Sequence, residues 1–415
     1  MVMAKLKLGR FKKVVKGEPD MLTREEFERK ERAIRIALIQ RLIPLGLMAA
    51  AEELQREVAS LAEATEGVYR HGSNPGTVLL GSQKVPIQVP RVRGPKGEIP
   101  LESYKLLHEG VEIDQSIISQ LFGGLSCRGL EKAQLPHPGT IGKSKSTASR
   151  RFVKASENRV KEFLERDLSA LDLVAVFIDG KYFGDCQMII ALGVGIDGVK
   201  HCLGFVEADS ENKAVIAELF RSLIARGLSA EASMLFIIDG SKGLRSAIRE
   251  VFGRRAVVQR CQWHKRENIV SYLPKGSQTT LRQRIQRAYD RPTLDEANRA
   301  LAVIENELAE SNQSAARSLL EGKDETLTLH RLGLQASIGA SFRTTNCIES
   351  LNALAEQKCG RVDSWKNSEH RQRWLSLALL EVEPNLRKVK GYAQLEHLRR
   401  VIQNETNKHS QNLTK

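Results

Sequence analysis

The sequence predicts a mixed α/β protein, with a helical insertion in the α/β core and smaller helical and β regions before it. Two observations favour this class. The apolar segments 173–179 and 233–239 each end in an aspartate followed by glycine, which is typical of a buried strand that ends in a turn. Residues 264–338, in contrast, have polar helical sequence without strand signals. The core therefore begins as a sheet and is interrupted by helices.

Length and composition indicate a globular chain of several domains. Of 415 residues, 41% are hydrophobic and 27% charged, which is enough apolar material for a real core. The longest apolar run is 42–51, about half of the roughly 20 residues that cross a bilayer, and the first 20 residues lack a signal-peptide pattern. Six cysteines without a CxxC pair are typical of reduced thiols. We therefore expect a cytoplasmic protein with no membrane partner.

The charge of the chain points to a polyanionic partner. The formal net charge is +14, which makes nucleic acid the first candidate, although a merely basic surface is the alternative. The positive charge is concentrated in two stretches. Residues 142–161 contain seven Lys or Arg and one acid, and residues 241–290 contain twelve and three. Both stretches are candidate DNA-binding surfaces.

The chain before residue 170 is expected to hold the DNA-binding regions. A basic arm, 1–16, precedes a helix that begins at the capping box Thr23-x-x-Glu26. Residues 72–100 are rich in Gly and Pro, and the alternation of Val85, Ile87 and Val89 predicts a hairpin or a three-stranded sheet.

Short helices over 115–122 and 127–133 and a long helix over about 147–168 suggest a helix-turn-helix. The basic start of the long helix suits phosphate contact, while a solvated basic face on a linker helix is the alternative. The candidate DNA contacts here are Lys143, Lys145, Arg150, Arg151 and Lys154.

Residues 173–263 have the clearest strand pattern. Two strands flank Asp197-Gly198, a strong signal for a two-residue hairpin. Three strands in a meander, then helix, strand, helix and strand, are the order of the RNase H-like fold, which we therefore expect. The elements after the meander are a helix over 211–226, a strand over 233–239, a helix over 241–252 and a strand over 256–259.

Asp179 and Asp239 end the first and fourth strands, which lie side by side in a sheet of this order. Two adjacent carboxylates repel each other unless a cation separates them, and Mg²⁺ prefers oxygen ligands. A two-metal site for phosphodiester chemistry is the resulting hypothesis. The alternative is that Asp-Gly at a strand end is ordinary turn chemistry.

Glu349 and the Cys261–His264 pair are further candidates. Glu349 lies in the first turn of a helix expected to begin near Asn346, where it could supply a third carboxylate to the site. Asn346-x-x-Glu349 also matches a capping box, which needs no function, and spacing alone does not decide between these two roles. Cys261 and His264 lack a second pair of zinc ligands nearby, which favours a fold-stabilising role beside the active site over structural zinc. Lys265, Arg266 and Arg343 extend the predicted DNA-binding surface.

Four segments, FIDGKYF, FIIDGSKGLRSAI, CQWH and RTTNCIESLN, together resemble the bacterial Mutator-type insertion-sequence transposases, a family of DDE transposases. The resemblance covers residues 70–385 and implies a helical insertion between the second Asp and the Glu. It assigns the catalytic and metal-binding triad to Asp179, Asp239 and Glu349, and so resolves the ambiguity over Glu349. Cys261 and His264 match the family's Cys-x-x-His signature, and with Asn346 they are expected to support the active site.

The resemblance also implies the activity and the partners. The protein would bind the terminal inverted repeats of its element, cut the DNA with Mg²⁺ (Mn²⁺ as a substitute), and join the released 3′-hydroxyl to target DNA. Its partners would be double-stranded DNA and further copies of itself, in a homodimer or a higher multimer that pairs two ends in the bacterial nucleoid. The rival hypotheses are a non-catalytic, domesticated DNA-binding regulator and another RNase H-like nuclease.

The expected organisation has seven parts. A basic arm and N-terminal helices (1–68), a small β region (69–110) and HTH-like helices (111–170) precede the first core segment (171–263), the helical insertion (264–340), the second core segment (341–385) and a C-terminal tail (386–415).

Overall fold

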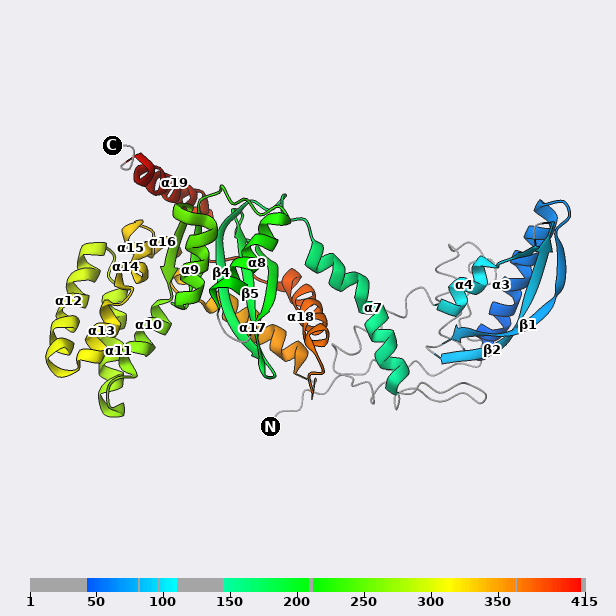
Figure 1. The fold of residues 1–415 in the computed structure, drawn as a ribbon, viewed down its shortest axis with the longest axis horizontal. Coiled ribbons are helices and arrows are strands. Elements are labelled where there is room, and N and C mark those ends of the chain that lie inside the picture. The colour runs from blue at the N-terminus through cyan, green and yellow to red at the C-terminus, as the bar shows by residue number, and fades with distance from the viewer. Residues whose placement is uncertain are drawn as a thin grey trace, which may run out of the picture. The chain divides into compact units, whose positions relative to one another are not determined.

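A computed structural model describes most of the chain after residue 42 (Figure 1). The described ranges are 43–80, 83–95, 97–109, 145–208, 212–360, 362 and 364–411. The chain divides into two compact units, Met1–Phe152 and Val153–Lys415. The basic arm, the helix expected from Thr23 and the two short helices of the predicted helix-turn-helix lie outside the described residues.

The first unit contains the predicted three-stranded sheet. Strands β1 (Tyr69–Leu80), β2 (Gln83–Gly94) and β3 (Gly97–Ile99) are antiparallel neighbours in that order. Helices α3 (Ile43–Ala64) and α4 (Glu102–Glu109) share one apolar core with the sheet.

Glu57 of α3 joins the two helices of this unit. Its carboxylate accepts hydrogen bonds from the backbone N–H groups of Glu102 (3.0 Å) and Ser103 (2.9 Å). These groups lie at the start of α4, where helical N–H groups have no partner within the helix and negative charge is favourable. A residue of one helix therefore caps the next.

The second unit is built on a five-stranded mixed sheet. Its order is β6-β5-β4-β7-β8, with an antiparallel meander joined to two parallel strands, as the sequence predicts. The turn expected at Asp197-Gly198 joins β5 to β6, but it is longer than the predicted two residues: residues 196–199 separate the strands, Gly195 N–H donates to Val199 O, and Gly198 has a positive φ of 83°. The bounds are β4 Leu173–Phe183, β5 Cys186–Gly195, β6 Lys200–Ala208, β7 Met234–Ile238 and β8 Ala256–Arg260.

Two helices cover one face of this sheet. They are α8 (Lys213–Ala225) and α9 (Lys242–Phe252), and Phe220, Phe236 and Phe252 form an aromatic cluster beneath them. The opposite face is met by helices that come later in the chain, as the contact of Phe177 with Phe342 shows (ring centroids 5.6 Å apart). Side chains alternate between the faces of a strand, so each face of β4 has its own neighbours.

The helical insertion has a hydrophobic core of its own. It follows β8 as the sequence predicts, and Figure 1 shows its helices gathered beside the sheet. Its helices are α10 (Gln262–Val270), α11 (Lys275–Tyr289), α12 (Leu294–Ser311), α13 (Gln313–Leu320), α14 (Lys323–Thr326), α15 (Thr328–Arg331) and α16 (Gln335–Phe342).

The remaining helices are α7 (Lys145–Glu165), α17 (Asn346–Cys359), α18 (Ser368–Val382) and α19 (Leu395–Gln411), with 3-10 turns at Gly253–Arg255, Glu383–Asn385 and Tyr392–Gln394. The tail expected over 386–415 contains a helix. Helix α19 continues to Gln411, because Ile402 and Thr406 are buried and the Thr406 hydroxyl lies 3.0 Å from that of Ser233. Across the described residues, no helix is both long enough and apolar enough to span a bilayer.

Candidate active site

Asp179 and Asp239 lie at matching positions of two adjacent parallel strands. Phe177 of β4 pairs with Ile237 of β7, and each aspartate lies two residues further along its own strand or just beyond it. Val176 and Ile178 point into the core under α8 and α9. Asp179 shares the other face of β4 with Phe177, because side chains two residues apart lie on the same face. It therefore faces the later helices.

Asp239 is fixed by the turn that leads into α9. Its Oδ1 accepts a hydrogen bond from the backbone N–H of Ser241 (2.9 Å), and the Ser241 hydroxyl in turn caps the helix by accepting from Leu244 N–H. Gly240 between them has φ +109°, and a Cβ there would collide with the Arg260 guanidinium. The glycine of this Asp-Gly pair is thus required by the turn and by the close approach of Arg260.

Helix α17 binds β4 through side chains on one helical face. The Asn352 amide donates a hydrogen bond to Asp179 Oδ2 (2.8 Å), and Lys181 pairs with Glu356 at 2.9 Å. Asn352 is 3% exposed, and among the described residues its Oδ1 has no hydrogen-bond partner. A buried carbonyl oxygen next to a carboxylate is an acceptor available to a ligand or a hydrated cation.

Glu349 lies one turn before Asn352, in the first turn of α17. The alternative capping box is not formed: the N-cap is Thr345, one residue earlier than that motif requires, and no side chain caps the helix. Glu349 Oε1 instead accepts a hydrogen bond from the Thr345 hydroxyl and lies 3.9 Å from His264 Nε2. The carboxylate therefore accepts from the side chain of its own N-cap residue and lies beside the Cys261–His264 segment.

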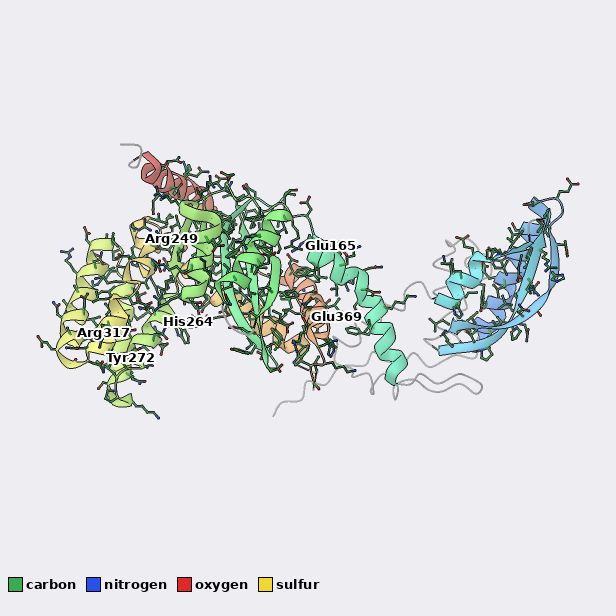
Figure 2. All side chains as sticks on the ribbon, viewed as in Figure 1. Glu165, Arg249, His264, Tyr272, Arg317 and Glu369 are labelled. Atoms are coloured by element: carbon green, nitrogen blue, oxygen red, sulfur yellow. The ribbon has the colours of Figure 1, made fainter. Side chains whose placement is uncertain are left out.

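Cys261, His264 and Thr345 form a compact cluster beside Glu349. The Thr345 hydroxyl is 3.3 Å from Cys261 Sγ and 3.3 Å from His264 Nδ1, and Cys261 Sγ accepts from the backbone N–H of His264 (3.5 Å). His264 lies near the start of α10, where the chain leaves the sheet for the helical insertion (Figure 2). The Cys-x-x-His motif thus joins β8, α10 and α17.

The electrostatics of the cluster connect it to both strand-end and helix carboxylates. The hydrogen bond with Cys261 raises the pKa of His264 to about 9, and the charges of Glu349 and Asp239 add to the rise. Burial opposes ionisation of Cys261, but hydrogen bonds from His264 and Thr345 outweigh it and lower the pKa of the thiol. Its thiol neighbour and the two acids therefore all favour the protonated form of His264.

The structure brings Thr345, and not Asn346, into this cluster. Asn346 is exposed at the start of α17, whereas Thr345 is fully buried. Sequence analysis missed Thr345 because its partner Cys261 lies 84 residues away. Asn352 had a visible signal, since its spacing of three from Glu349 puts both on one side of the helix.

The predicted DNA contacts have different outcomes. Lys154 is exposed on α7, as a phosphate contact requires, and Lys143 lies outside the described residues, as do the side chains of Lys145, Arg150 and Arg151. Lys265 is a correction: it is 1% exposed and pairs with Glu321 at 3.1 Å, so it cannot reach DNA.

Arg266 and Arg343 have acidic partners as well. Arg266 binds Glu267 at 3.0 Å, and Arg343 binds Asp290 at 2.8 Å. Part of the positive charge counted in the sequence is therefore neutralised inside the protein.

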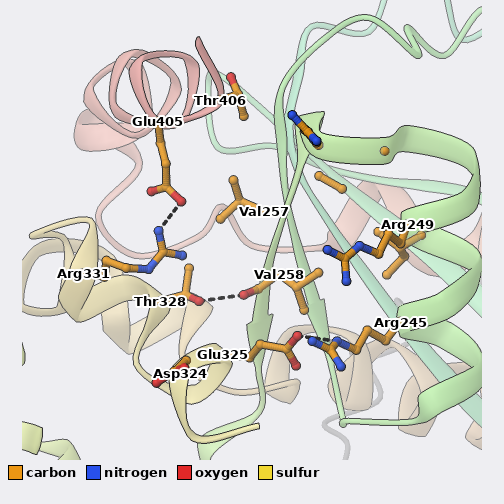
Figure 3. A pocket seen from close by; sticks show the side chains of 14 residues that line it. Arg245, Arg249, Val257, Val258, Asp324, Glu325, Thr328, Arg331, Glu405 and Thr406 are labelled. Carbon is orange, nitrogen blue, oxygen red and sulfur yellow. Dashed lines mark hydrogen bonds and ion pairs between the residues drawn. The ribbon is translucent and has the colours of Figure 1, made fainter. Parts of the chain in front are cut away.

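A cavity of about 790 Å³ lies between α9, β8, α14, α15 and α19 (Figure 3). Ion pairs of Arg245 with Glu325 and of Arg331 with Glu405 line it, and the Thr328 hydroxyl donates to Val258 O (2.7 Å). None of the three candidate carboxylates lines this cavity. It is a seam that joins the insertion and the C-terminal helix to the sheet, and not the candidate active site.

The carboxylates of Asp179 and Asp239 and the amide oxygen of Asn352 are suitable ligands for a hard cation, although they do not form a complete coordination site. Carboxylates and a buried amide oxygen are the ligand types that Mg²⁺ accepts. Within the part of the chain that the structure describes, no group of three or more His, Cys, Asp or Glu is close enough to hold a metal ion. The three predicted acids therefore lie on β4, directly after β7 and on α17, without converging on one metal site.

Two carboxylates at matching positions of adjacent parallel strands, a third on a later helix and an intervening helical insertion are the arrangement expected of a transposase. The chain belongs to the Mutator family of transposases, whose family model matches residues 26–388.

Its relatives include transposases of insertion sequences from several bacteria. The chain is 30% identical over 215 residues to that of IS6120 from Mycolicibacterium smegmatis (50% of this chain, 65% of the relative) and 30% identical over 232 residues to that of IS905 from Lactococcus lactis (54% and 57%). It is 26% identical over 335 residues to that of IS406 from Burkholderia multivorans (76% and 81%). The match thus spans less than two thirds of the first two relatives and about four fifths of the third.

Proposed function

We propose that this transposase cuts double-stranded DNA at the terminal inverted repeats of an insertion sequence and joins the released 3′-hydroxyl to target DNA. The catalytic residues in this proposal are Asp179, Asp239 and Glu349, on a core of the RNase H-like type. The observation that supports it most directly is the parallel register of β4 and β7, which gives the two aspartates matching positions.

Helix α17 supplies the third carboxylate of the proposed site. It is attached to the same strand through the hydrogen bond from Asn352 to Asp179, and Glu349 lies one helical turn earlier. The Cys261–His264 pair supports this acid through Thr345 and through the 3.9 Å approach of His264.

The cofactor in this proposal is Mg²⁺, with Mn²⁺ as a substitute, held by Asp179, Asp239 and Glu349. When bound, two divalent ions would supply positive charge for the attacking and leaving oxygens of a phosphodiester exchange. The protein's own part is to keep three acids at one edge of the sheet. The amide of Asn352 and the backbone N–H of Ser241 orient two of them without adding charge.

The partners in this proposal are transposon ends, target DNA and at least one further copy of the chain, in the bacterial cytoplasm. Basic residues of α7, such as the exposed Lys154, would hold phosphates. The non-catalytic regulator remains the outcome to test against, although binding DNA alone requires no aligned carboxylates.

The test is a cleavage and strand-transfer assay with Mg²⁺ on the DNA that flanks the gene. Wild type should give joined products, and Asp239→Asn should give none while binding the ends with unchanged affinity. Asp197→Asn is the matched control, because Asp197 lies in the β5–β6 turn and Asn keeps an acceptor for Val199 N–H. Tight binding without products by wild type, with Mn²⁺ and paired ends also tried, would favour the regulator.

A further inference from the structure

Thr345 occupies a helix N-cap but does not cap the helix. A threonine at this position ordinarily accepts a hydrogen bond from the second or third N–H of the helix and so stabilises the helix. Thr345 makes no such bond at the start of α17. Its side chain is fully buried and turned the other way, toward Glu349, Cys261 and His264. The usual contribution to helix stability is absent, so the orientation of the hydroxyl requires another explanation.

The hydroxyl lies at the meeting point of two helix starts. Cys261 is the N-cap of α10 and Thr345 that of α17, and Thr345 Oγ1 lies 3.3 Å from Cys261 Sγ. The backbone holds the same two segments together, since Gln262 N–H donates to Arg343 O (3.0 Å). The position of the hydroxyl is therefore set by two chain segments and not by a side-chain torsion alone.

Glu349 needs such a partner. Its side chain is 39% exposed, and a glutamate has more rotamer freedom to lose than most side chains when it is held in one position. The Thr345 hydroxyl binds Oε1 and leaves Oε2 for another contact. A hydroxyl has one proton and can donate to one acceptor at a time, and among its three neighbours the carboxylate is the nearest.

We propose that Thr345 is a positioning residue. Its hydroxyl anchors Glu349 to the Cys261–His264 pair and so keeps this third carboxylate on the side of the sheet that carries Asp179 and Asp239. The proposal rests on the function proposed above. It gives the Cys-x-x-His motif a role, because Cys261 and His264 contact the Thr345 hydroxyl and His264 also lies beside Glu349. It also accounts for a buried N-cap threonine whose hydroxyl binds a side chain and not the backbone N–H groups of its helix.

The experiment compares Thr345→Val with Thr345→Ser in the full-length protein. Valine keeps the shape and removes the hydroxyl, whereas serine keeps the hydroxyl. Thr344→Val is the matched control, because Thr344 is the preceding threonine and its hydroxyl meets only the backbone N–H of Asn346 (3.5 Å) among the contacts described. Three quantities are measured: single-turnover cleavage at saturating DNA, Mn²⁺ affinity by titration, and the Kd for end DNA.

We expect Thr345→Val to lower the cleavage rate and the Mn²⁺ affinity by about 10–100-fold, the range typical of residues that orient metal ligands. The Kd for DNA should not change. Thr345→Ser should keep the cleavage rate and the Mn²⁺ affinity within a few fold of wild type, and Thr344→Val should match wild type. A purely structural threonine would lower the melting temperature without a hydroxyl-specific effect on Mn²⁺ affinity.

Two results would overturn the proposal: wild-type cleavage and Mn²⁺ affinity in Thr345→Val, or equal defects in the Val and Ser variants. Mn²⁺ affinity separates this failure from that of the proposed function, because it can be measured even if wild type cuts no DNA. If the valine variant does not fold, Thr345→Ala against Thr345→Ser makes the same comparison of side chains with and without a hydroxyl.

Discussion

The strand ends of the central sheet and the helical insertion use charged side chains in different ways. In the insertion, acids bind guanidinium groups: Arg282 pairs with Glu267 at 2.9 Å and Arg284 with Glu307 at 2.5 Å. At the strand ends the described contacts of the acids include neutral donors, such as Ser241 N–H to Asp239. A neutral donor orients a carboxylate and keeps its charge, whereas a guanidinium neutralises it.

This difference teaches that local charge counts do not locate a DNA surface. Residues 241–290 have twelve basic and three acidic residues, but acids from later in the insertion pair with some of these basic residues. Lys265 is the extreme case, since it is buried and burial lowers its pKa. Ion pairs thus neutralise part of the positive charge in the insertion, whereas Asp239 beside the sheet is bound by a neutral backbone N–H.

The largest effect on stability is expected where the strand-end geometry depends on a glycine. Gly240→Ala should destabilise the fold by about 2–4 kcal/mol, because alanine is strained at φ +109° and its Cβ would displace the buried Arg260. Gly253→Ala is the control: Gly253 also has a positive φ (+59°), but a Cβ there meets nothing within 4 Å, so the cost should be about 1 kcal/mol. Denaturant unfolding of both variants measures the difference. Equal losses would mean that Arg260 does not constrain the turn.

The elements of the core could be predicted from the sequence because their signals are local. The turn at Asp197-Gly198 and the helix at Asn346 appear at the expected places, and β7 ends directly before Asp239 as expected. The strand end predicted at Asp179 is wrong, because β4 continues to Phe183 and its residues 179 and 180 stay paired with β5. Contacts between distant segments could not be predicted. The link of Thr345 to Cys261 and the burial of Lys265 against Glu321 depend on how the insertion folds back, which no local pattern encodes.

The second prediction sharpens the comparison by measuring DNA binding against salt. Arg150→Ala combined with Arg151→Ala should weaken binding and reduce the slope of log Kd against log salt by about 1 for each phosphate that the variant no longer binds. Lys265→Met should leave the slope unchanged, because its ammonium group is buried against Glu321. The comparison fails if Lys265→Met flattens the slope as much as the arginine pair does.

The smallest effect concerns a buried histidine of the insertion. His330 is 4% exposed, its Nε2 lies 3.1 Å from Tyr289 O and 3.0 Å from Arg291 O, and burial lowers its pKa, with Arg343 lowering it further and Asp290 opposing. A lowered pKa means that the unfolded chain binds a proton first as the pH falls through about 6.5. Wild type should therefore lose stability progressively below that pH, until the folded protein also takes up the proton.

His330→Gln should remove this part of the pH dependence, because glutamine can still donate to a carbonyl but does not titrate. The measurement is the melting temperature of the full chain between pH 7.5 and pH 5, with His397→Gln as the control, since His397 is exposed on α19. A shallower acid-side decline in the His330 variant alone is the expected result. If the melting temperatures of both variants and of wild type fall in parallel with pH, the prediction is wrong. The buried imidazole of His330 would then take up its proton in the folded protein without a cost in stability.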